Sequence, residues 1–403
     1  MLEIEECLEL LLEHAKLQDC VQMPIEKAAG MVLAEDVYAP IAVPPFPKSA
    51  MDGYAVCAKD IEQAGKEHPV KLSVIGENLA GDAGEYRYRP GTAVRIMTGG
   101  MIPEGFDTIV RQEDTDYGEE QVRIYHKAAL YSNYCKVGED ICQGERVVSD
   151  GQRLSPLQLG LLAETGVEKV SVRRPVQVAI LCTGSELVLP GMALQKGKIY
   201  NNISFILGAQ IENEGLVVCS RRLVADEEEL LAGALEEALK VADLVITTGA
   251  VSVGKKDIVP GVLEKIGAQI LFRRAKVQPG TPTTASVKDG KIILSLSGNP
   301  YAAMVHFELY FWELAARMMG HDSFRPVKKT AVLMTDYPKI NKMRRLVRAY
   351  EEDGRVSLPA QVHASSVISN LTRCNCLIDL EAGRQVSVGD QVTIRRLKGM
   401  GSW

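Results

Sequence analysis

Residues 178–187, VAILC followed by TGSEL, open a segment in which three apolar runs each lead directly into a polar loop. The second run is ADLVI at 242–246, before TTGAVSVGKKD at 247–257, and the third is KIILSL at 291–296, before SGNPYAA at 297–303. Unbroken runs of Val, Ile and Leu are typical of parallel strands that helices cover on both faces. Because such sheets bind ligands at the carboxyl ends of their strands, the three loops predict a ligand site.

Strands and helices alternate from about residue 173 to about residue 325. This length is well below the roughly 250 residues of an eight-stranded α/β barrel, so we expect a doubly wound parallel sheet. One of its helices is expected over DEEELLAGALEEALKVA at 226–242. Asp226 would be its N-cap, with Glu229 as the capping-box partner three residues later.

The remaining sequence predicts three further units. Short β-type runs separated by Gly, Asp and Pro indicate a β-rich domain at 44–145. Residues 1–43 and 146–172 mix helical and extended segments and are expected to form one discontinuous linker domain. Runs such as TAVLMT and DQVTIRR indicate a small C-terminal β-barrel at 326–403. The chain is therefore expected to be an α/β multidomain protein.

The composition limits the classes of function. A chain of 403 residues with 46% hydrophobic and 24% charged residues is typical of a soluble protein with several domains. A formal net charge of −6 argues against a general nucleic-acid binder, and no run approaches the ~18 apolar residues of a membrane span. The first residues lack the pattern of a secretory signal, and nine scattered cysteines suit reduced thiols. We expect a cytoplasmic protein.

The loop at 247–257 is the most ligand-like part of the predicted sheet. Gly249 and Gly254 allow the backbone to approach an anion, Ser252 adds a donor, and Asp257 stands where a helix would begin. The loop has neither the Walker spacing nor the GxGxxG dinucleotide fingerprint. An ordinary turn, with Asp257 as an N-cap, is the alternative.

Two carboxylates are expected at the same edge of the sheet, Glu186 from TGSEL and Asp257. Mg²⁺ takes oxygen ligands and usually one or two protein carboxylates, so this pair predicts a magnesium ion that bridges phosphates. A solvated helix start is the alternative for Glu186. The loop SGNP at 297–300 would supply backbone donors at a helix entrance.

Three polar turns stand out in the β-rich region. Asp52 follows a proline-rich stretch, Thr98 precedes two glycines, and Asp140 ends Gly-Glu-Asp. Each is more often an ordinary turn than a site. The six histidines form no recognisable set with Ser, Cys and Asp, so triad chemistry is disfavoured.

Seven segments together resemble one family, the molybdopterin molybdenumtransferases related to the C-terminal part of gephyrin. They are PPFPKSAMDGYAV at 44–56, RIMTGGMIPEGFDTIV at 95–110, GEDI at 138–141, TGSEL at 183–187, TTGAVSVGKKD at 247–257, QPGTP at 278–282 and SGNP at 297–300. SAMDGYAV joined to MTGGMIPEG is the most specific combination. The resemblance implies an elongated homodimer of four domains, in which the α/β domain is of the molybdopterin-binding type and meets the partner's β-rich domain.

The resemblance also implies the reaction. Adenylylated molybdopterin and molybdate would become the molybdenum cofactor with release of AMP, assisted by Mg²⁺. The implied partners are a second copy of the chain, the small pterin substrate and a molybdopterin adenylyltransferase. The alternative is a non-catalytic relative that binds molybdopterin or a nucleotide as a carrier or regulator.

The resemblance also implies functional residues, each at a position of this sequence that matches a family motif. The implied catalytic residues are Asp52, Thr98, Asp140, Glu186 and Asp257, of which Glu186 and Asp257 would hold Mg²⁺. The implied cofactor-binding residues are Thr183, Gly184, Ser185, Gly249, Ser252, Gly254, Pro279, Gly280, Ser297, Gly298, Asn299 and Pro300. The implied oxyanion residues are Arg274, Lys276, Ser365 and Ser366.

The chain departs from the family pattern at the expected oxyanion site. Gln278 and Thr281 stand where the family usually has lysine, so two positive charges are missing. Nearby basic residues that could compensate are Arg274, Lys276, Lys255 and Lys256. Ala225 replaces one of a usual pair of aspartates. These departures are what motivates the non-catalytic alternative.

Overall fold

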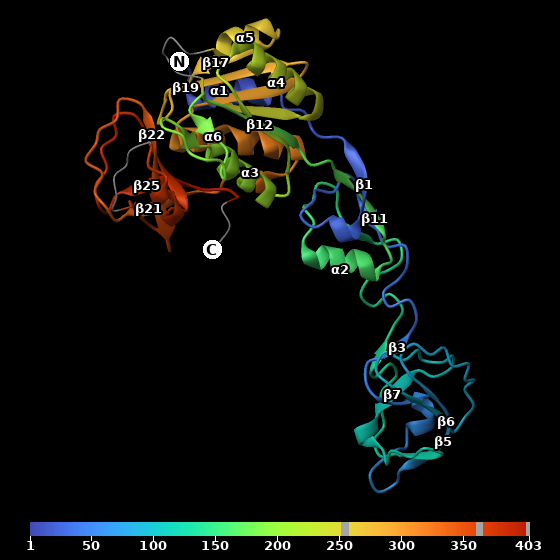
Figure 1. Ribbon diagram of the computed structural model, residues 1–403. Helices are drawn as coiled ribbons and strands as arrows, with labels where there is room; N and C mark the ends of the chain where they lie inside the picture. The colour runs from blue at the N-terminus through green and yellow to red at the C-terminus, as the bar shows by residue number, and fades with distance from the viewer. Residues whose placement is uncertain (251–257, 360–365, 400–403) are drawn as a thin grey trace.

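The chain folds into several units arranged one after another, so the molecule is elongated (Figure 1). The structure, a computed structural model, describes residues 1–250, 258–359 and 366–399. An α/β unit lies at one end with a C-terminal β-barrel beside it, a small linker unit follows, and a β-rich unit forms the other end. The α/β multidomain architecture expected from the sequence is confirmed.

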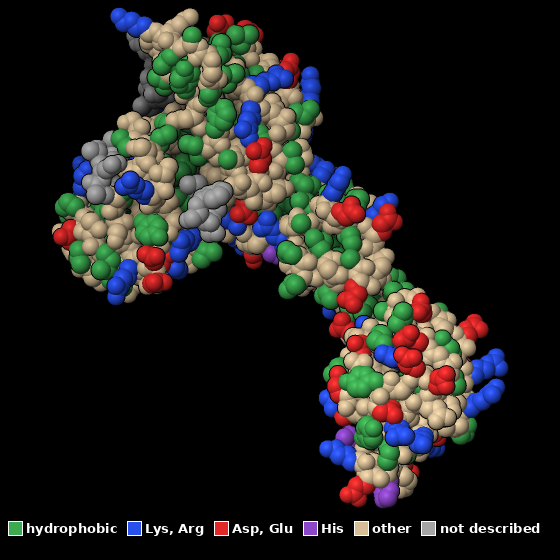
Figure 2. All heavy atoms as spheres, turned by 60° about the horizontal axis from the view of Figure 1, so that its bottom comes forward, with side chains coloured by type: hydrophobic (Ala, Val, Ile, Leu, Met, Phe, Trp, Pro, Cys, Tyr) green, Lys and Arg blue, Asp and Glu red, His purple; other side chains and the backbone are tan. Residues whose placement is uncertain are grey.

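Acidic and basic side chains are interspersed on the face that Figure 2 shows, where Lys and Arg gather into no single large patch. In the part of the chain that the structure describes, no helix combines the length and the apolar character needed to cross a membrane.

The α/β unit is built on a six-stranded sheet with the order β15-β12-β16-β20-β19-β17. Its first four strands are parallel, as expected, whereas β19 runs antiparallel to both of its neighbours. β19 is absent from the sequence prediction; Asp289 and Gly290, both at positive φ, join it to β20 in a two-residue hairpin. The strands are β12 (Gln177–Thr183), β15 (Val217–Val224), β16 (Leu244–Thr248), β17 (Gln269–Arg274), β19 (Pro282–Lys288) and β20 (Lys291–Leu296).

Helices cover both faces of this sheet. Val178 and Ile180 of β12 pack with α1, α3 and α6, whereas Ala179 and Leu181 pack with α4 and α5. This alternation is that of a strand buried on both faces, which explains its continuous apolar sequence. The helices are α1 (Ile4–Leu12), α3 (Ile203–Asn213), α4 (Glu228–Val241), α5 (Val259–Lys265) and α6 (Pro300–Met319).

The first helix, α1, belongs to this core rather than to the linker unit. Ile4, Cys7 and Leu11 are fully buried in the same cluster as Trp312 of α6. From the sequence, residues 1–43 were expected together in the linker, because an amphipathic period indicates a buried face without identifying what covers it.

The linker unit consists of two short antiparallel ladders and one helix. β1 (Cys20–Pro24) pairs with β11 (Lys169–Arg173), and β2 (Val37–Tyr38) pairs with β10 (Arg146–Val148). Helix α2 (Pro156–Glu164) begins with Ser155 as N-cap and with proline in its first turn.

The β-rich unit is a five-stranded sheet with the order β7-β4-β6-β5-β8, beside a small two-stranded ladder. Its core contains Tyr54 and Val110 on one side and Ile109 and Phe106 on the other. The strands are β3 (Lys48–Ser49), β4 (Gly53–Val56), β5 (Val70–Asn78), β6 (Thr92–Ile96), β7 (Thr108–Arg111), β8 (Gln121–Ile124) and β9 (Tyr134–Cys135).

The C-terminal strands close into the barrel that the sequence predicts. Their order is β22-β23-β21-β25-β24, and β24 pairs again with β22. β18, from the α/β side, adds to β22. The strands are β18 (Val277–Gln278), β21 (Lys328–Leu333), β22 (Arg344–Glu352), β23 (Arg355–Ser357), β24 (Cys376–Leu380) and β25 (Gln391–Arg396).

Helix α6 carries a buried carboxyl group, Glu308, which is 2% exposed. It accepts hydrogen bonds from Gln210 Nε2 at 2.6 Å and from the backbone N–H of Lys398 at 3.3 Å. Burial raises the pKa of Glu308 to about 8, although these donors favour the charged form. Because the folded pKa lies above the unfolded value, the contribution of this group to stability is complete at acid pH and is lost as the pH rises toward 8.

We therefore expect Glu308→Gln to flatten the dependence of stability on pH. The wild-type protein should lose on the order of a few kcal/mol between pH 5 and pH 8 through this group, and the variant should not. Urea midpoints across this range measure the effect, with the exposed Glu236→Gln on α4 as the matched control. Parallel pH profiles for Glu308→Gln and the wild type would contradict the assignment.

Candidate functional site

A pocket of about 580 Å³ lies at the carboxyl ends of β12, β16 and β20. The loops after these strands, the first residues of α3 and α6 and one residue next to the barrel line it. The sequence-predicted residues among its lining are Thr183, Gly184, Glu186, Gly249, Ser297, Gly298, Asn299, Pro300 and Ser366. Three loops that are more than 40 residues apart in sequence thus meet at one edge of the sheet, as parallel strands require.

Two glycines allow these loops to approach one another. Gly249 has φ +93°, and a Cβ there would lie 2.2 Å from the carbonyl oxygen of Thr183. A Cβ on Gly298 would lie 3.2 Å from the Cα of Gly249. The first glycine is therefore required by both its backbone conformation and the available space.

Asp226 is a pocket residue that the sequence analysis assigned to a different role. Helix α4 begins at Glu228 with Glu227 as N-cap, so the prediction of Asp226 as N-cap is wrong. Instead, Asp226 Oδ2 accepts hydrogen bonds from Ser185, from N–H at 3.0 Å and from Oγ at 3.2 Å. An aspartate between a strand and a helix has the same sequence pattern in either role, which is why the sequence does not distinguish them.

Asp226 also has a buried oxygen, Oδ1, that lacks a hydrogen-bond partner among the described residues. Asp226 and Glu186 both line the pocket. A buried carboxylate oxygen without a donor is costly unless a ligand or cation satisfies it. The pocket therefore presents oxygen ligands of the kind that a hard cation prefers.

Two helix N-termini face the same space. Asn299 is the N-cap of the long helix α6, and its Oδ1 accepts a hydrogen bond from the N–H of Ala302. Asn202 and Ile203, at the start of α3, also line the pocket. The positive ends of helix dipoles and their free N–H groups favour phosphate groups. The pocket thus combines helix N-termini, which suit anions, with carboxylates, which suit a cation.

Five predicted binding residues do not line this pocket: Ser185, Arg274, Lys276, Pro279 and Gly280. Lys276 Nζ instead forms an ion pair with Glu3 at 2.8 Å, and Arg274 lies at the end of β17 with an exposed side chain. Pro279 and Gly280 lie beside the buried ring of His306, to which a Cβ on Gly280 would approach within 2.8 Å.

The barrel supplies a cation beside Gln278, one of the two positions where the family usually has lysine. Arg345 of β22 donates from Nη1 to Gln278 Oε1 at 3.3 Å, through the pairing of β18 with β22. Thr281 Oγ1 donates to the carbonyl oxygen of Val277 at 3.1 Å. Arg345 was not predicted from the sequence, because 67 residues separate it from Gln278 and no local pattern connects two such strands.

Asp52 and Thr98 come together in the β-rich unit. Asp52 Oδ1 accepts hydrogen bonds from the N–H and the hydroxyl of Thr98, both at 2.7 Å. These bonds hold the pKa of Asp52 below its ordinary value, so the side chain stays an anion. Asp140 follows β9, and its N–H donates to the carbonyl oxygen of Val43.

Within one chain, however, this unit and the pocket lie at opposite ends of the molecule (Figure 1). Of the expected catalytic residues that the structure describes, Glu186 therefore lies at the pocket, and Asp52 and Thr98 lie at the other end. Four further expected residues, Ser252, Gly254, Asp257 and Ser365, lie outside the described residues.

Three regions of the chain match known families. Residues 2–166 match the MoeA N-terminal region (domain I and II), residues 179–316 a probable molybdopterin binding domain, and residues 330–397 the MoeA C-terminal region (domain IV). The molybdopterin molybdenumtransferase of Bacillus subtilis is 34% identical over 399 residues, which cover 96% of this chain and 93% of the relative. That of Haemophilus influenzae is 34% identical over 401 residues, which cover 96% and 98%.

The fold comparison agrees with the sequence comparison. The crystal structure of a molybdopterin biosynthesis MoeA protein from Pyrococcus horikosii superimposes with a TM-score of 0.86, at 30% identity and over 100% of both chains. Since relatives above 30% identity match almost the whole chain and three regions match in the expected order, this chain belongs to the MoeA family of molybdopterin molybdenumtransferases.

Proposed function

We propose that this chain transfers molybdenum to molybdopterin, converting adenylylated molybdopterin and molybdate into the molybdenum cofactor with release of AMP. The observation that carries the proposal is the pocket at the strand ends, where Glu186 and Asp226 stand beside the N-termini of α3 and α6. A substrate with several phosphate groups needs both anion-binding N–H groups and a cation to balance its charge.

Mg²⁺ is the cation that suits this pocket. We propose that Glu186 and Asp226 contribute ligands, since Asp226 Oδ1 is buried without a partner among the described residues and both side chains line the pocket. When bound, the ion would neutralise the phosphates and stabilise the charge that develops as AMP leaves. Asp257, expected from the sequence in the same role, remains part of the proposal.

We further propose that the working site needs two copies of the chain. Asp52 and Thr98 are tightly bonded to each other but lie at the far end of their own chain from the pocket. The Asp52 of one copy would then face the pocket of another, in a homodimer. Because its pKa is low, Asp52 suits the role of a fixed anion that orients water rather than a base that removes its proton.

We also propose the compartment in which the protein works and the partner that supplies its substrate. All nine cysteines are free in the structure, which fits a reducing compartment, and we propose the cytoplasm. We also propose a molybdopterin adenylyltransferase as the partner that supplies the adenylylated substrate.

The function is tested by giving the purified protein adenylylated molybdopterin, molybdate and Mg²⁺ and measuring AMP by chromatography. We expect AMP and molybdenum cofactor in equal amounts, and much less of both when Mg²⁺ is chelated. Tight binding of the pterin without AMP release would overturn the proposal and favour a non-catalytic carrier.

The proposed binding site for molybdate can be tested separately. Ser366 lines the pocket, and Arg345 lies beside Gln278, so this region already holds one cation where the family usually has lysines. Replacing Gln278 and Thr281 by lysine should tighten molybdate binding by roughly tenfold or less, because each added charge is partly exposed and screened. Molybdate titration by calorimetry measures this effect. Unchanged affinity would remove residues 278 and 281 from the proposed oxyanion site.

A further inference from the structure

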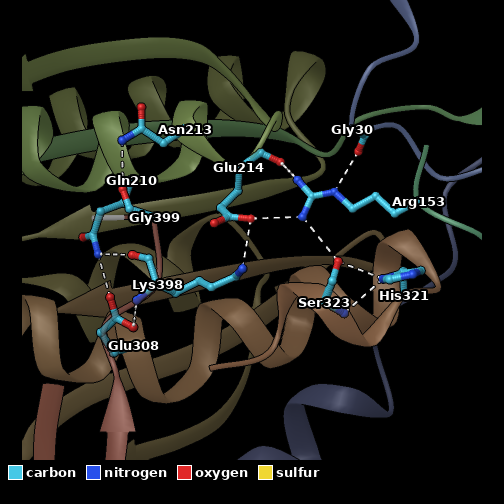
Figure 3. Close-up of polar contacts among 10 residues, drawn as sticks. All are labelled: Gly30, Arg153, Gln210, Asn213, Glu214, Glu308, His321, Ser323, Lys398 and Gly399. Atoms are coloured by element: carbon cyan, nitrogen blue, oxygen red, sulfur yellow. Dashed lines mark hydrogen bonds and ion pairs between the residues drawn. The ribbon is translucent and has the colours of Figure 1, made fainter. Parts of the chain in front are cut away.

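Three parts of the chain meet at one carboxylate, Glu214, directly after helix α3 (Figure 3). Glu214 Oε2 lies 3.2 Å from Arg153 Nη1, in the linker unit, and 3.1 Å from Lys398 Nζ, which follows the last barrel strand. The side chains are 14%, 23% and 20% exposed, respectively, so the group is largely enclosed. We call these three residues the clasp.

Arg153 is the residue of the clasp with the most extensive contacts. Its Nε donates to the carbonyl oxygen of Gly30 at 2.8 Å, within the linker unit. Its Nη2 donates to the carbonyl oxygen of Glu214 at 2.9 Å, and its Nη1 reaches Ser323 Oγ at 3.3 Å. The guanidinium also lies 4.6 Å from the ring centroid of Phe324. A planar, rigid group that donates in several directions fixes orientation better than a single charge does.

The contacts of Arg153 join the α/β unit to a second part of the molecule. The chain passes between these two parts through two strands, β1 and β11. Residues 20–173, which we call the arm, comprise the linker and β-rich units and enter and leave through β1 and β11. Gly30 and Arg153 belong to the arm, whereas Glu214, Ser323 and Phe324 belong to the α/β unit. Val32 of the arm also packs in the α/β core. Together with the clasp, this contact limits rotation of the arm about the β1–β11 ladder.

The arm carries Asp52 at its far end, where a small change of direction at the clasp becomes a large displacement. We propose that Arg153 is a positioning residue that fixes the direction of the arm and so delivers Asp52 to the pocket of the partner subunit. This inference rests on the proposed function. Misplacing a reacting group by about 1 Å can reduce a rate by roughly a hundredfold.

The clasp also connects the arm to the barrel, because Lys398 follows the last barrel strand. The backbone N–H of Lys398 donates to Glu308 Oε2, and its carbonyl oxygen accepts from Gln210 Nε2 at 2.8 Å. The residue after it, Gly399, accepts from Asn213 Nδ2 at 2.8 Å. The segment that leaves the barrel is therefore tied to α3 and α6 by its backbone. Glu214 thus contacts both the arm, through Arg153, and the segment that leaves the barrel, through Lys398. The arm and the barrel both contribute residues to the proposed site.

The test compares Arg153→Met, Arg153→Lys and the wild type as full-length protein. Methionine keeps an apolar side chain in place of the arginine stem and removes the donors, whereas lysine keeps the charge opposite Glu214 and loses the planar group. Arg146→Met is the matched control, because Arg146 pairs at 3.1 Å with Asp36, which also lies in the arm. Small-angle X-ray scattering reports the arm direction, and steady-state kinetics report its consequence.

For Arg153→Met we expect a scattering profile that shows a wider range of arm directions, with circular dichroism like that of the wild type. We expect kcat to fall about ten- to a hundredfold while KM for the pterin changes less than threefold, because the pocket itself is untouched. Arg153→Lys should be intermediate and Arg146→Met unchanged. Scattering and kcat like those of the wild type in Arg153→Met would overturn the inference, as would an equal effect in Arg146→Met. If the wild type itself released no AMP, the proposed function would fail, whereas the scattering comparison would still decide whether Arg153 directs the arm.

Discussion

A mixture of Asp52→Ala and Glu186→Ala chains is expected to regain about a quarter of the wild-type transferase activity, although each variant alone should lose at least roughly a hundredfold. The expectation follows from the positions of the two residues at opposite ends of one chain. If each site takes Glu186 from one copy and Asp52 from another, a mixed dimer has one site with both residues intact and one site with both replaced.

Random exchange of subunits makes about half of the dimers mixed, and half of the sites in those dimers are intact, which gives the value of about one quarter. The two variants should be co-expressed with different tags, or refolded together, and AMP release measured per site. Purifying the dimers that carry both tags should raise the recovered activity to about half of the wild-type value.

A second mixture provides the matched control. Thr98 donates two hydrogen bonds to Asp52 within the same unit, so Asp52→Ala and Thr98→Val damage the same half of the site. Their mixture should contain no site with both Asp52 and Thr98 intact, and its activity should not exceed the average of the separate variants. No recovery in the first mixture, or equal recovery in both, would rule out a site shared between subunits.

The sequence predicted the sheet and the location of the pocket because both depend on local patterns. The apolar runs of β12, β16 and β20 identify buried parallel strands, and the loops that follow them must meet at one edge. Glu186, Gly249 and Asn299 line the pocket for this reason.

What the sequence did not reveal depends on contacts between distant segments. Asp226 has the sequence context of an N-cap, and only the position of Ser185 shows that its carboxylate turns toward the pocket. Arg345 reaches Gln278 through a pairing of strands that no local pattern predicts. The contact between Arg153 and Glu214 is of the same kind, since neither residue is distinctive among the many charged residues of the chain.

Gly249→Ala is expected to damage both the stability of the α/β unit and its ligand site. A non-glycine residue at φ +93° costs about 1–2 kcal/mol from the backbone conformation alone. The added Cβ would lie 2.2 Å from the carbonyl oxygen of Thr183 and 2.8 Å from its Oγ1, so β12 and β16 must separate at their carboxyl ends. Together these effects should cost about 3 kcal/mol or more, within the range of severe single substitutions.

The loss should extend to ligand binding, because the displaced loops line the pocket between Thr183 and Gly298. We expect at least a roughly tenfold weaker affinity for AMP, measured by calorimetry in the presence of Mg²⁺, together with a lower urea midpoint. Gly233→Ala is the matched control: this glycine lies within α4, and a Cβ there would meet no atom within 4 Å. It should stabilise the protein by about 0.5–1 kcal/mol because alanine favours the helix, and it should leave AMP binding unchanged because Gly233 does not line the pocket. If Gly249→Ala unfolded at the same urea concentration as the wild type and bound AMP equally well, the close approach of the two strand ends would not be what shapes this pocket.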